Sequence, residues 1–364
     1  MQWLKEFQTA LYALDGVGAV TFHQVLKTLT EAEGTEADFW VGKGNIWQKI
    51  KLQEKVVQSI RKFKKEYTSS SYFESLSEKG IRVVLPAEGE FPPLLEQLPR
   101  HPPLLFARGP QLSGKEAFLA VVGTRSITDY GRRVVRDFIP PLVQFGKTIV
   151  SGFMYGVDVA AQRATLAAGG KTVGVLGFGF DHMYPPEQRA LLYWFLDRGA
   201  TFFSPFAPHV PAKPGNFPAR NTVVAGMSEG VLVIEGAEDS GSLITAHCAA
   251  ELGRDVWAVP GSIYSRFSVG TQQLLNEGAQ LVNSAGEMFG LTKRQFRKIE
   301  VQRQTWAQLP ELKRKVCELL WNESMTTDIL QEKLACNSSE LAIQLVELEM
   351  LGLIEQVGNR WSLK

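Results

Sequence analysis

From Ala117 onward the chain alternates short apolar runs with longer amphipathic segments, and this alternation constrains its fold more than any other feature. The runs, in chain order, are FLAVVG, TIVSG, TVGVLG, TFFSP, GVLVIEG, DVWAVPG and QLV. Strands of a parallel sheet are apolar along their whole length because helices cover both faces of the sheet. The pattern therefore predicts an α/β chain with a Rossmann-like doubly wound, mostly parallel sheet.

The segments on either side of this pattern differ from it. The first 70 residues read as short helices, and two glycines within residues 14–19 resemble the turn of a helix-hairpin-helix. A glycine-bearing helix connection without a ligand explains these residues equally well. From Gly80 to Gly109, a strand-like start precedes a proline-dense stretch in which we expect no regular helix.

Three helical periods and a strand pair close the chain, which is typical of a small winged-helix-like domain. The predicted organisation is a helical domain at residues 1–70, an extended Rossmann-like domain at 71–290, a basic linker at 291–310 and a winged-helix-like domain at 311–364.

Charge is unevenly distributed although the net charge is only +1. Residues 49–65 carry seven bases against one acid, whereas residues 316–364 carry eight acids against three bases. An acidic segment repels phosphate, so we expect the C-terminal domain to have a regulatory or protein-contacting role. No apolar stretch reaches the roughly 18 residues of a membrane span. We therefore expect a cytoplasmic protein.

The sequence matches two nucleotide-binding motifs only in part. The Gly-Lys-Thr tripeptides at 146–148 and 170–172 lack the upstream glycine of a phosphate-binding loop, and each precedes a strand where that loop must open a helix. The dinucleotide-like Gly177 and Gly179 lack a third glycine, which His182 replaces. The three cysteines are widely spaced. We therefore expect no cofactor and no metal site.

Candidate ligand-binding residues follow the apolar runs, because ligands of doubly wound sheets lie beyond the carboxyl ends of the strands. Gly123 and Arg125 follow the first run, and Ser151 and Gly152 end the second. A guanidinium beside a glycine turn suits bidentate contact with a phosphate. Its alternative role is an ordinary salt bridge.

Two further groups complete the candidate site. The first group combines cations with an aromatic face and consists of Lys213, Phe217, Arg220 and Asn221. Such a combination lets an unpaired base stack on the ring while the cations bind the nucleic-acid backbone. A hydrophobic staple with a capping Asn is the alternative for this group. The second group consists of Ser240, Gly241, Ser242 and Thr245. Their hydroxyls and backbone N–H groups can bind an anion. The alternative role, a plain helix cap, explains only one of the serines.

The motifs VVGTR, IVSGF, VLGFGFDHMYP, FPARN, VLVIEGAEDSGSLITA, GRDVWAVPG and GTQQLLNEGA resemble, in order and spacing over residues 117–282, the DNA processing protein A (DprA/Smf) family. The resemblance implies a single-stranded-DNA-binding protein of natural transformation, which protects incoming strands and helps to load a RecA-type recombinase. It implies a homodimer and no enzymatic activity. It also implies that Arg125 contacts DNA and that Lys213, Phe217, Arg220 and Asn221 belong to a second DNA-contacting stretch.

The sequence departs from the family pattern at several positions. Residues 153–155 and Gln162 replace a Leu-Ala-x run and a His, Asn221-Thr222 stands where Arg-Asn-Arg is common, and Gln272 replaces an Asn. A nucleotide phosphoribohydrolase-like enzyme is the rival interpretation, and it requires a poised carboxylate pair. Its candidates are Glu235, Glu238 and Asp239. A second alternative makes the winged helix the principal DNA reader.

Overall fold

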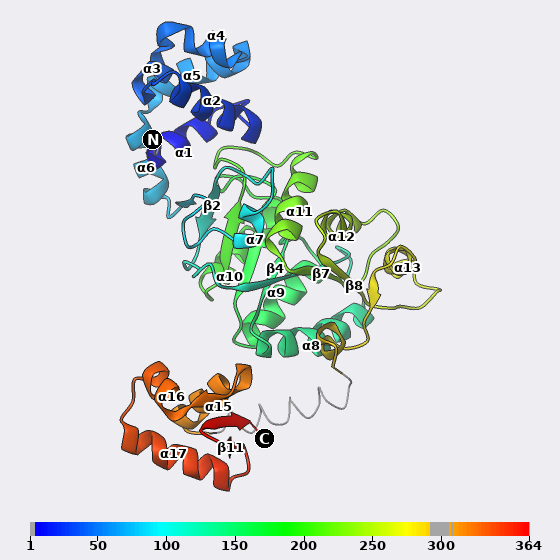
Figure 1. Ribbon diagram of the computed structural model, residues 1–364. Helices are drawn as coiled ribbons and strands as arrows, with labels where there is room; N and C mark the ends of the chain where they lie inside the picture. The colour runs from blue at the N-terminus through cyan, green and yellow to red at the C-terminus, as the bar shows by residue number, and fades with distance from the viewer. Residues whose placement is uncertain (1–3, 292–305, 307–308, 364) are drawn as a thin grey trace. The chain divides into compact units, whose positions relative to one another are not determined.

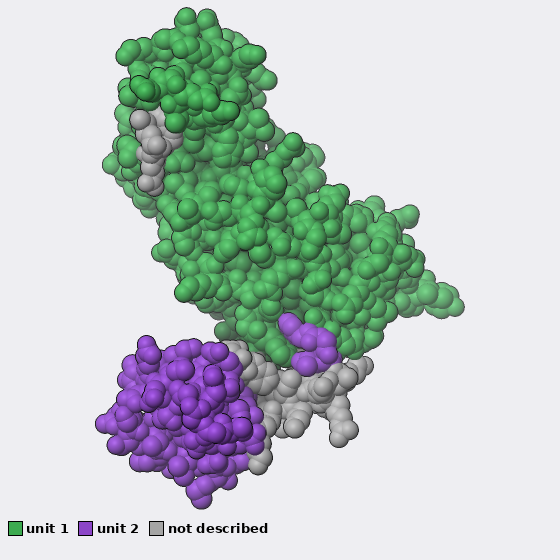
Figure 2. Space-filling model, in the orientation of Figure 1, with its two compact units in different colours: residues 1–288 green, residues 289–364 purple. Residues whose placement is uncertain are grey.

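The computed structural model describes residues 4–291, Trp306 and residues 309–363 (Figure 1). The chain divides into two compact units, Met1–Met288 and Phe289–Lys364 (Figure 2). The predicted basic linker, residues 291–310, lies for the most part outside the described residues. The boundary expected at residue 70 lies within the first unit, and the domain limits stay predictions.

A nine-stranded sheet forms the centre of the first unit, in the order β1-β2-β6-β5-β4-β3-β7-β8-β9. Each parallel strand coincides, to within one residue at its start, with part of the apolar run that predicted it: β3 (Ala117–Val122), β4 (Lys147–Ser151), β5 (Thr172–Val175), β6 (Thr201–Ser204), β7 (Gly230–Val233), β8 (Asp255–Ala258) and β9 (Gln280–Leu281). Lys147 and Thr172 of the two Gly-Lys-Thr tripeptides begin strands, as predicted. The doubly wound, mostly parallel sheet is therefore confirmed.

Two antiparallel strands, β1 (Arg82–Val84) and β2 (Leu105–Arg108), extend one edge of this sheet beside β6. Between them, the proline-dense stretch contains one helical turn, α7 (Pro93–Glu96). The expectation of no regular helix here was wrong for this turn. Pro93 is its first residue, where the missing N–H has no intrahelical acceptor to lose.

Helices cover both faces of the sheet because right-handed crossovers connect its parallel strands. They are α8 (Asp129–Gln144), α9 (Val157–Ala167), η2 (Pro186–Gln188), α10 (Arg189–Leu196), α11 (Asn216–Met227), α12 (Gly241–Glu251), α13 (Val269–Asn276) and η3 (Ala285–Phe289). Helix α8 packs on α9, and α11 packs on α12 (Figure 1). The strand order reverses between β3 and β7, and such a reversal leaves a crevice at the carboxyl ends of the strands.

The N-terminal part is helical, as predicted, with α1 (Lys5–Tyr12), α2 (Ala19–Glu31), α3 (Glu36–Val41), η1 (Lys43–Asn45), α4 (Ile46–Ile50), α5 (Glu54–Glu66) and α6 (Ser69–Glu78). Phe7, Phe22 and Phe39 belong to a core of its own. Helices α1 and α6 also share a core with the sheet, in which Tyr72 and Phe178 are buried. These helices therefore pack onto the sheet and are not an isolated module.

The second unit contains α15 (Glu311–Asn322), β10 (Met325–Thr326), α16 (Thr327–Leu334), α17 (Ser338–Met350), β11 (Ile354–Val357) and β12 (Arg360–Leu363). Its strands form a small antiparallel sheet in the order β10-β12-β11, over a core that includes Leu330, Leu345 and Trp361. Three helices and a wing confirm the predicted winged-helix domain. No helix in the described part of the chain is long and apolar enough to cross a membrane.

Candidate nucleic-acid interface

A cavity of about 420 Å³ opens at the reversal point of the sheet, beyond the ends of β3, β4 and β7. Ten of the twelve residues proposed from the sequence line it: Gly123, Arg125, Gly152, Phe217, Arg220, Asn221, Ser240, Gly241, Ser242 and Thr245. Ser151 and Lys213 do not line it. Arg125 and Phe217, which come from separate loops, therefore face one shared space.

Arg125 is the exposed cation of this cavity. The turn before it is tight, because the Thr124 N–H donates to the Glu235 carbonyl at 2.7 Å. A Cβ atom on Gly123 would lie 2.7 Å from the same carbonyl oxygen, so only glycine fits there. Within residues 4–291, Arg125 forms no ion pair, and the salt-bridge alternative is not what the structure contains. Its guanidinium is available to a ligand.

Arg220 lies beneath the cavity and is only 4% exposed. Its guanidinium donates to the carbonyls of Gly152 and Val175, and its Nε donates to the Asn221 side-chain oxygen at 3.0 Å. A Cβ atom on Gly152 would lie 2.6 Å from a guanidinium nitrogen, which explains the glycine. Arg220 therefore holds the ends of two strands together and contributes positive charge from below.

Asp158 is the buried counter-charge of Arg220. Burial raises the pKa of Asp158 to about 6, and the positive charge of Arg220 opposes this rise. Burial likewise lowers the pKa of Arg220 to about 10, while Asp158 raises it and Arg125 lowers it. The Asp158 carboxylate accepts the Met154 N–H at 3.2 Å. The charge of Arg125 therefore acts on Arg220, and two guanidinium groups contribute positive charge to one cavity.

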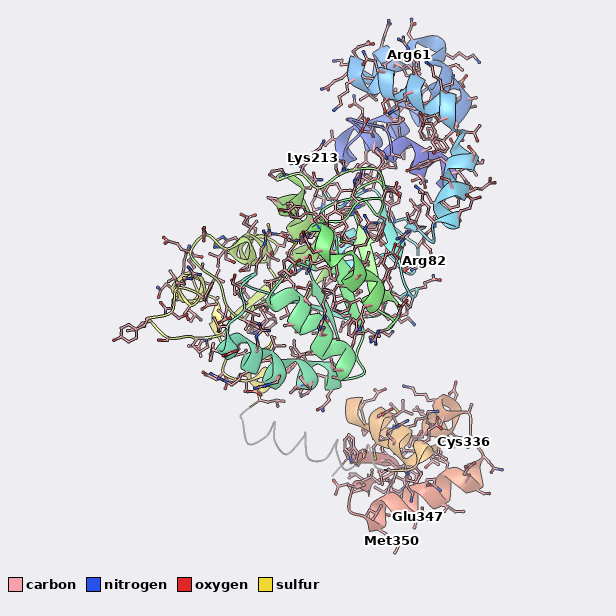
Figure 3. All side chains as sticks on the ribbon, turned by 180° about the vertical axis from the view of Figure 1, so that it is seen from behind. Arg61, Arg82, Lys213, Cys336, Glu347 and Met350 are labelled. Atoms are coloured by element: carbon pink, nitrogen blue, oxygen red, sulfur yellow. The ribbon has the colours of Figure 1, made fainter. Side chains whose placement is uncertain are left out.

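Phe217 forms an aromatic edge of the cavity. It lies half-buried in the first turn of α11, with its ring centroid 5.5 Å from that of Tyr184. Asn221 lies one turn further along α11, where its amide donates to the Gly241 carbonyl at 3.2 Å. The alternative of a capping Asn was wrong, because Asn221 is inside the helix. Lys213 lies on the exposed loop before α11, outside the cavity (Figure 3).

The serine group forms the N-terminus of α12. Ser240 is the N-cap and accepts the Ser242 N–H, and the two hydroxyls lie 2.8 Å apart. Gly241 is exposed in the first turn, and buried Thr245 lines the cavity one turn further along. A helix N-terminus carries partial positive charge and free N–H groups, so this side of the cavity favours an anion.

Ser151 does not itself line the cavity. Its side chain is buried, and its hydroxyl donates to the Val121 carbonyl at 2.6 Å. This bond joins β4 to β3 below the cavity floor. Any effect of Ser151 on a ligand is therefore indirect.

The carboxylates of the rival enzyme interpretation do not assemble at the cavity. Glu235 is buried and accepts the Thr128 N–H at 3.0 Å and the Thr128 hydroxyl, so it serves the start of α8. Asp239 lines the cavity, whereas exposed Glu238 does not. Of the three candidates, only Asp239 therefore lines the cavity, and the other acid that lines it, Asp158, is buried beside the charge of Arg220.

The sequence reasoning missed Met154 and Ile244, which add apolar surface to the cavity, and Asp158, the buried acid beside Arg220. For Asp158 a signal was present, since an acid directly after a strand end and a glycine turn faces the same edge as the other candidates. Met154 and Ile244 have no such signal, because apolar residues at a helix start usually pack into the core.

Comparison with known proteins shows the family to which the chain is related. Residues 82–293 match the family model described as DNA recombination-mediator protein A, and residues 302–360 match that of the DprA winged helix domain. Protein Smf of Escherichia coli (strain K12) is 37% identical over 287 residues, which are 75% of this chain and 75% of that protein. DNA processing protein DprA of Bacillus subtilis (strain 168) is 37% identical over 213 residues, 58% of this chain and 71% of that protein.

Two solved structures share the fold. The X-ray structure of DNA processing protein A from Streptococcus pneumoniae has a TM-score of 0.66 at 28% identity and covers 80% of this chain and 99% of that one. A structure of DNA processing protein A from Helicobacter pylori, reported for its single-stranded DNA binding mode, has a TM-score of 0.52 at 24% identity. It covers 58% of this chain and 94% of that one, and its likeness is one of fold.

Proposed function

This chain belongs to the DNA processing protein A family, and from that premise we propose that its cavity binds a short stretch of single-stranded DNA. The observation that carries the proposal is that the guanidinium of Arg125, which forms no ion pair in the part of the chain that the structure describes, and the half-buried ring of Phe217 line one cavity. A cation beside an aromatic face is the arrangement with which proteins hold an unpaired polynucleotide. The single-stranded DNA binding mode described for the Helicobacter pylori protein supports the same ligand.

The phosphate and the base occupy different sides of the cavity in this proposal. A phosphate lies between Arg125 and the N-terminus of α12 at Gly241, above the buried charge of Arg220. An adjacent base stacks on Phe217, next to Tyr184. Lys213 contacts the backbone as the strand leaves the cavity. Bases in a duplex are already stacked on one another, so Phe217 selects single strands.

The wider role is recombination mediation in the cytoplasm during natural transformation, with protection of incoming strands and loading of a RecA-type recombinase. The match to a family of recombination mediators supports it. One cavity holds few phosphates, so a homodimer with two linked cavities gains affinity through avidity. We expect the protein to accelerate recombinase filament growth on DNA coated with a single-strand-binding protein. Equal growth with and without the protein would contradict this role.

Binding to oligothymidylate is expected to be much stronger than binding to a duplex of equal length. Phe217→Ala is expected to weaken oligothymidylate binding roughly 5- to 150-fold, because one stacked base contributes about 1 to 3 kcal/mol. Fluorescence anisotropy at one fixed salt concentration measures both affinities. The control is Tyr193→Ala, which removes an exposed aromatic side chain outside the cavity. Equal affinity for the duplex would exclude the proposal.

A further inference from the structure

A second cavity, of about 220 Å³, lies between the N-terminal helices and the loops that follow β5 and β6. Phe63 of α5, Tyr67 directly after α5 and Tyr72 of α6 line it on one side, and Asp181 and His209 line it from the loops. Both sides belong to the first unit and share one buried core. The cavity is therefore a fixed feature of that unit.

The wall of this cavity is aromatic and contains an unsatisfied polar group. The ring centroid of Tyr72 lies 5.3 Å from that of Phe63 and 5.5 Å from that of Tyr67. Tyr72 is only 8% exposed, and its hydroxyl has no hydrogen-bond partner in the described part of the chain. Burial raises the pKa of this hydroxyl, which therefore stays protonated. A buried unpaired hydroxyl is unfavourable, so a ligand with a polar edge would satisfy it.

The helix beside the cavity, α5, carries five exposed basic residues and two acids, Glu54 and Glu66, of which Glu66 also lines the cavity. Lys55, Arg61, Lys62, Lys64 and Lys65 of α5 are exposed, and none forms an ion pair within residues 4–291. Lys62 lines the cavity itself, and Arg61 lies on the outer part of the helical region (Figure 3). This basic face corresponds to the charge run at residues 49–65, which the central cavity leaves unexplained.

Contacts within one stretch of loop lead from the first cavity to the second. Phe217 of the first cavity packs against Tyr184. Two residues earlier, the His182 ring is 2.8 Å from the carbonyl oxygen of His209, which lines the second cavity. The neighbouring Asp181 also lines it. The loop at residues 181–184 therefore connects the wall of the first cavity with the wall of the aromatic pocket.

We propose that the pocket of Tyr67 and Tyr72 binds a further unpaired base of the same single strand, with the adjoining phosphates on Lys62 and the basic face of α5. The inference rests on the proposed function. The pocket is smaller than the roughly 300 to 1,000 Å³ of drug-sized sites, so it suits a single ring system. Asp181 on its rim is paired with Lys79 at 3.0 Å. An aromatic pocket with acids on its rim accepts a base and leaves phosphates outside.

The test compares two oligothymidylates, one of roughly 5 nucleotides that fills only the central cavity and one of roughly 15 that reaches α5. Tyr67→Ala and Lys62→Glu are expected to weaken binding of the long oligonucleotide roughly 5- to 150-fold and to leave the short one unchanged. Tyr72→Phe keeps the ring and removes only the unpaired hydroxyl, so it is expected to weaken the long oligonucleotide alone. The matched controls are Tyr193→Ala and Lys27→Glu, which lie outside both cavities.

A fluorescent base locates the contact directly. With 2-aminopurine placed at successive positions of the long oligonucleotide, we expect two positions of strong quenching, and Tyr67→Ala should abolish only one of them. If the wild-type protein binds neither oligonucleotide, the proposed function itself is wrong. If Arg125→Ala weakens both lengths while Tyr67→Ala and Lys62→Glu change neither, the central site stands and this inference is overturned. That result would indicate that the pocket binds a side chain of a partner protein and not a base.

Discussion

Arg125→Ala is expected to weaken binding of oligothymidylate roughly 10- to 150-fold, because a hydrogen bond to a charged group contributes about 1.5 to 3 kcal/mol. Arg125 is exposed and forms no ion pair within residues 4–291, so its removal leaves no buried partner unsatisfied. The midpoint of thermal unfolding should therefore stay at the wild-type value. Anisotropy titration and a melting curve on the same sample separate the two effects.

The salt dependence of this variant identifies the contact as one with phosphate. Loss of one phosphate contact lowers the slope of log affinity against log salt by about 0.7 for a single strand. Arg125→Lys keeps the positive charge but loses the planar guanidinium that binds a phosphate with two hydrogen bonds. Its affinity should therefore lie between those of Arg125→Ala and the wild type. Arg136→Ala removes an exposed arginine of α8 outside the cavity and is the matched control. An unchanged salt slope would show that Arg125 does not contact a phosphate.

The alternating apolar runs predicted the parallel sheet because a strand covered on both faces can only be apolar along its length. The strand β2 (Leu105–Arg108) was missed, since the prolines before it concealed a short run whose partners, β1 and β6, come from other parts of the sequence. The core that α1 and α6 share with the sheet was missed for a related reason. Tyr72 and Phe178 belong to one core through tertiary packing, which local periodicity does not encode.

Most of the candidate site was predictable because parallel strands deliver their carboxyl ends to one edge. That rule places a residue at the edge but does not give the direction of its side chain. Ser151 points inward to the Val121 carbonyl, and Lys213 lies beyond the cavity. The burial of Arg220 depends on Gly152 from a different loop, whose missing Cβ makes room for the guanidinium. No pattern within the Phe-Pro-Ala-Arg-Asn segment carries that information.

Arg220→Ala is expected to lower the free energy of unfolding by about 3 to 5 kcal/mol, because each buried polar group left without its partner costs about 1 to 3 kcal/mol. The change removes the donors to the Gly152 and Val175 carbonyls and leaves the buried Asp158 carboxyl without its positive neighbour. Urea denaturation followed by circular dichroism measures the loss. Single-stranded DNA binding should fall as well, because the floor of the cavity is no longer held.

The pH dependence of this loss separates charge from packing. Burial already raises the pKa of Asp158 from its ordinary 3.8 to about 6, and removing Arg220 raises it further. The folded variant then holds a proton that the unfolded chain releases, so its stability falls as pH rises above 3.8 and up to the raised pKa. The loss should therefore be larger at alkaline than at acidic pH, and adding Asp158→Asn should remove that difference. An equal loss at every pH would mean that Asp158 is not coupled to the charge of Arg220, and that Arg220 stabilises the fold through packing and hydrogen bonds alone.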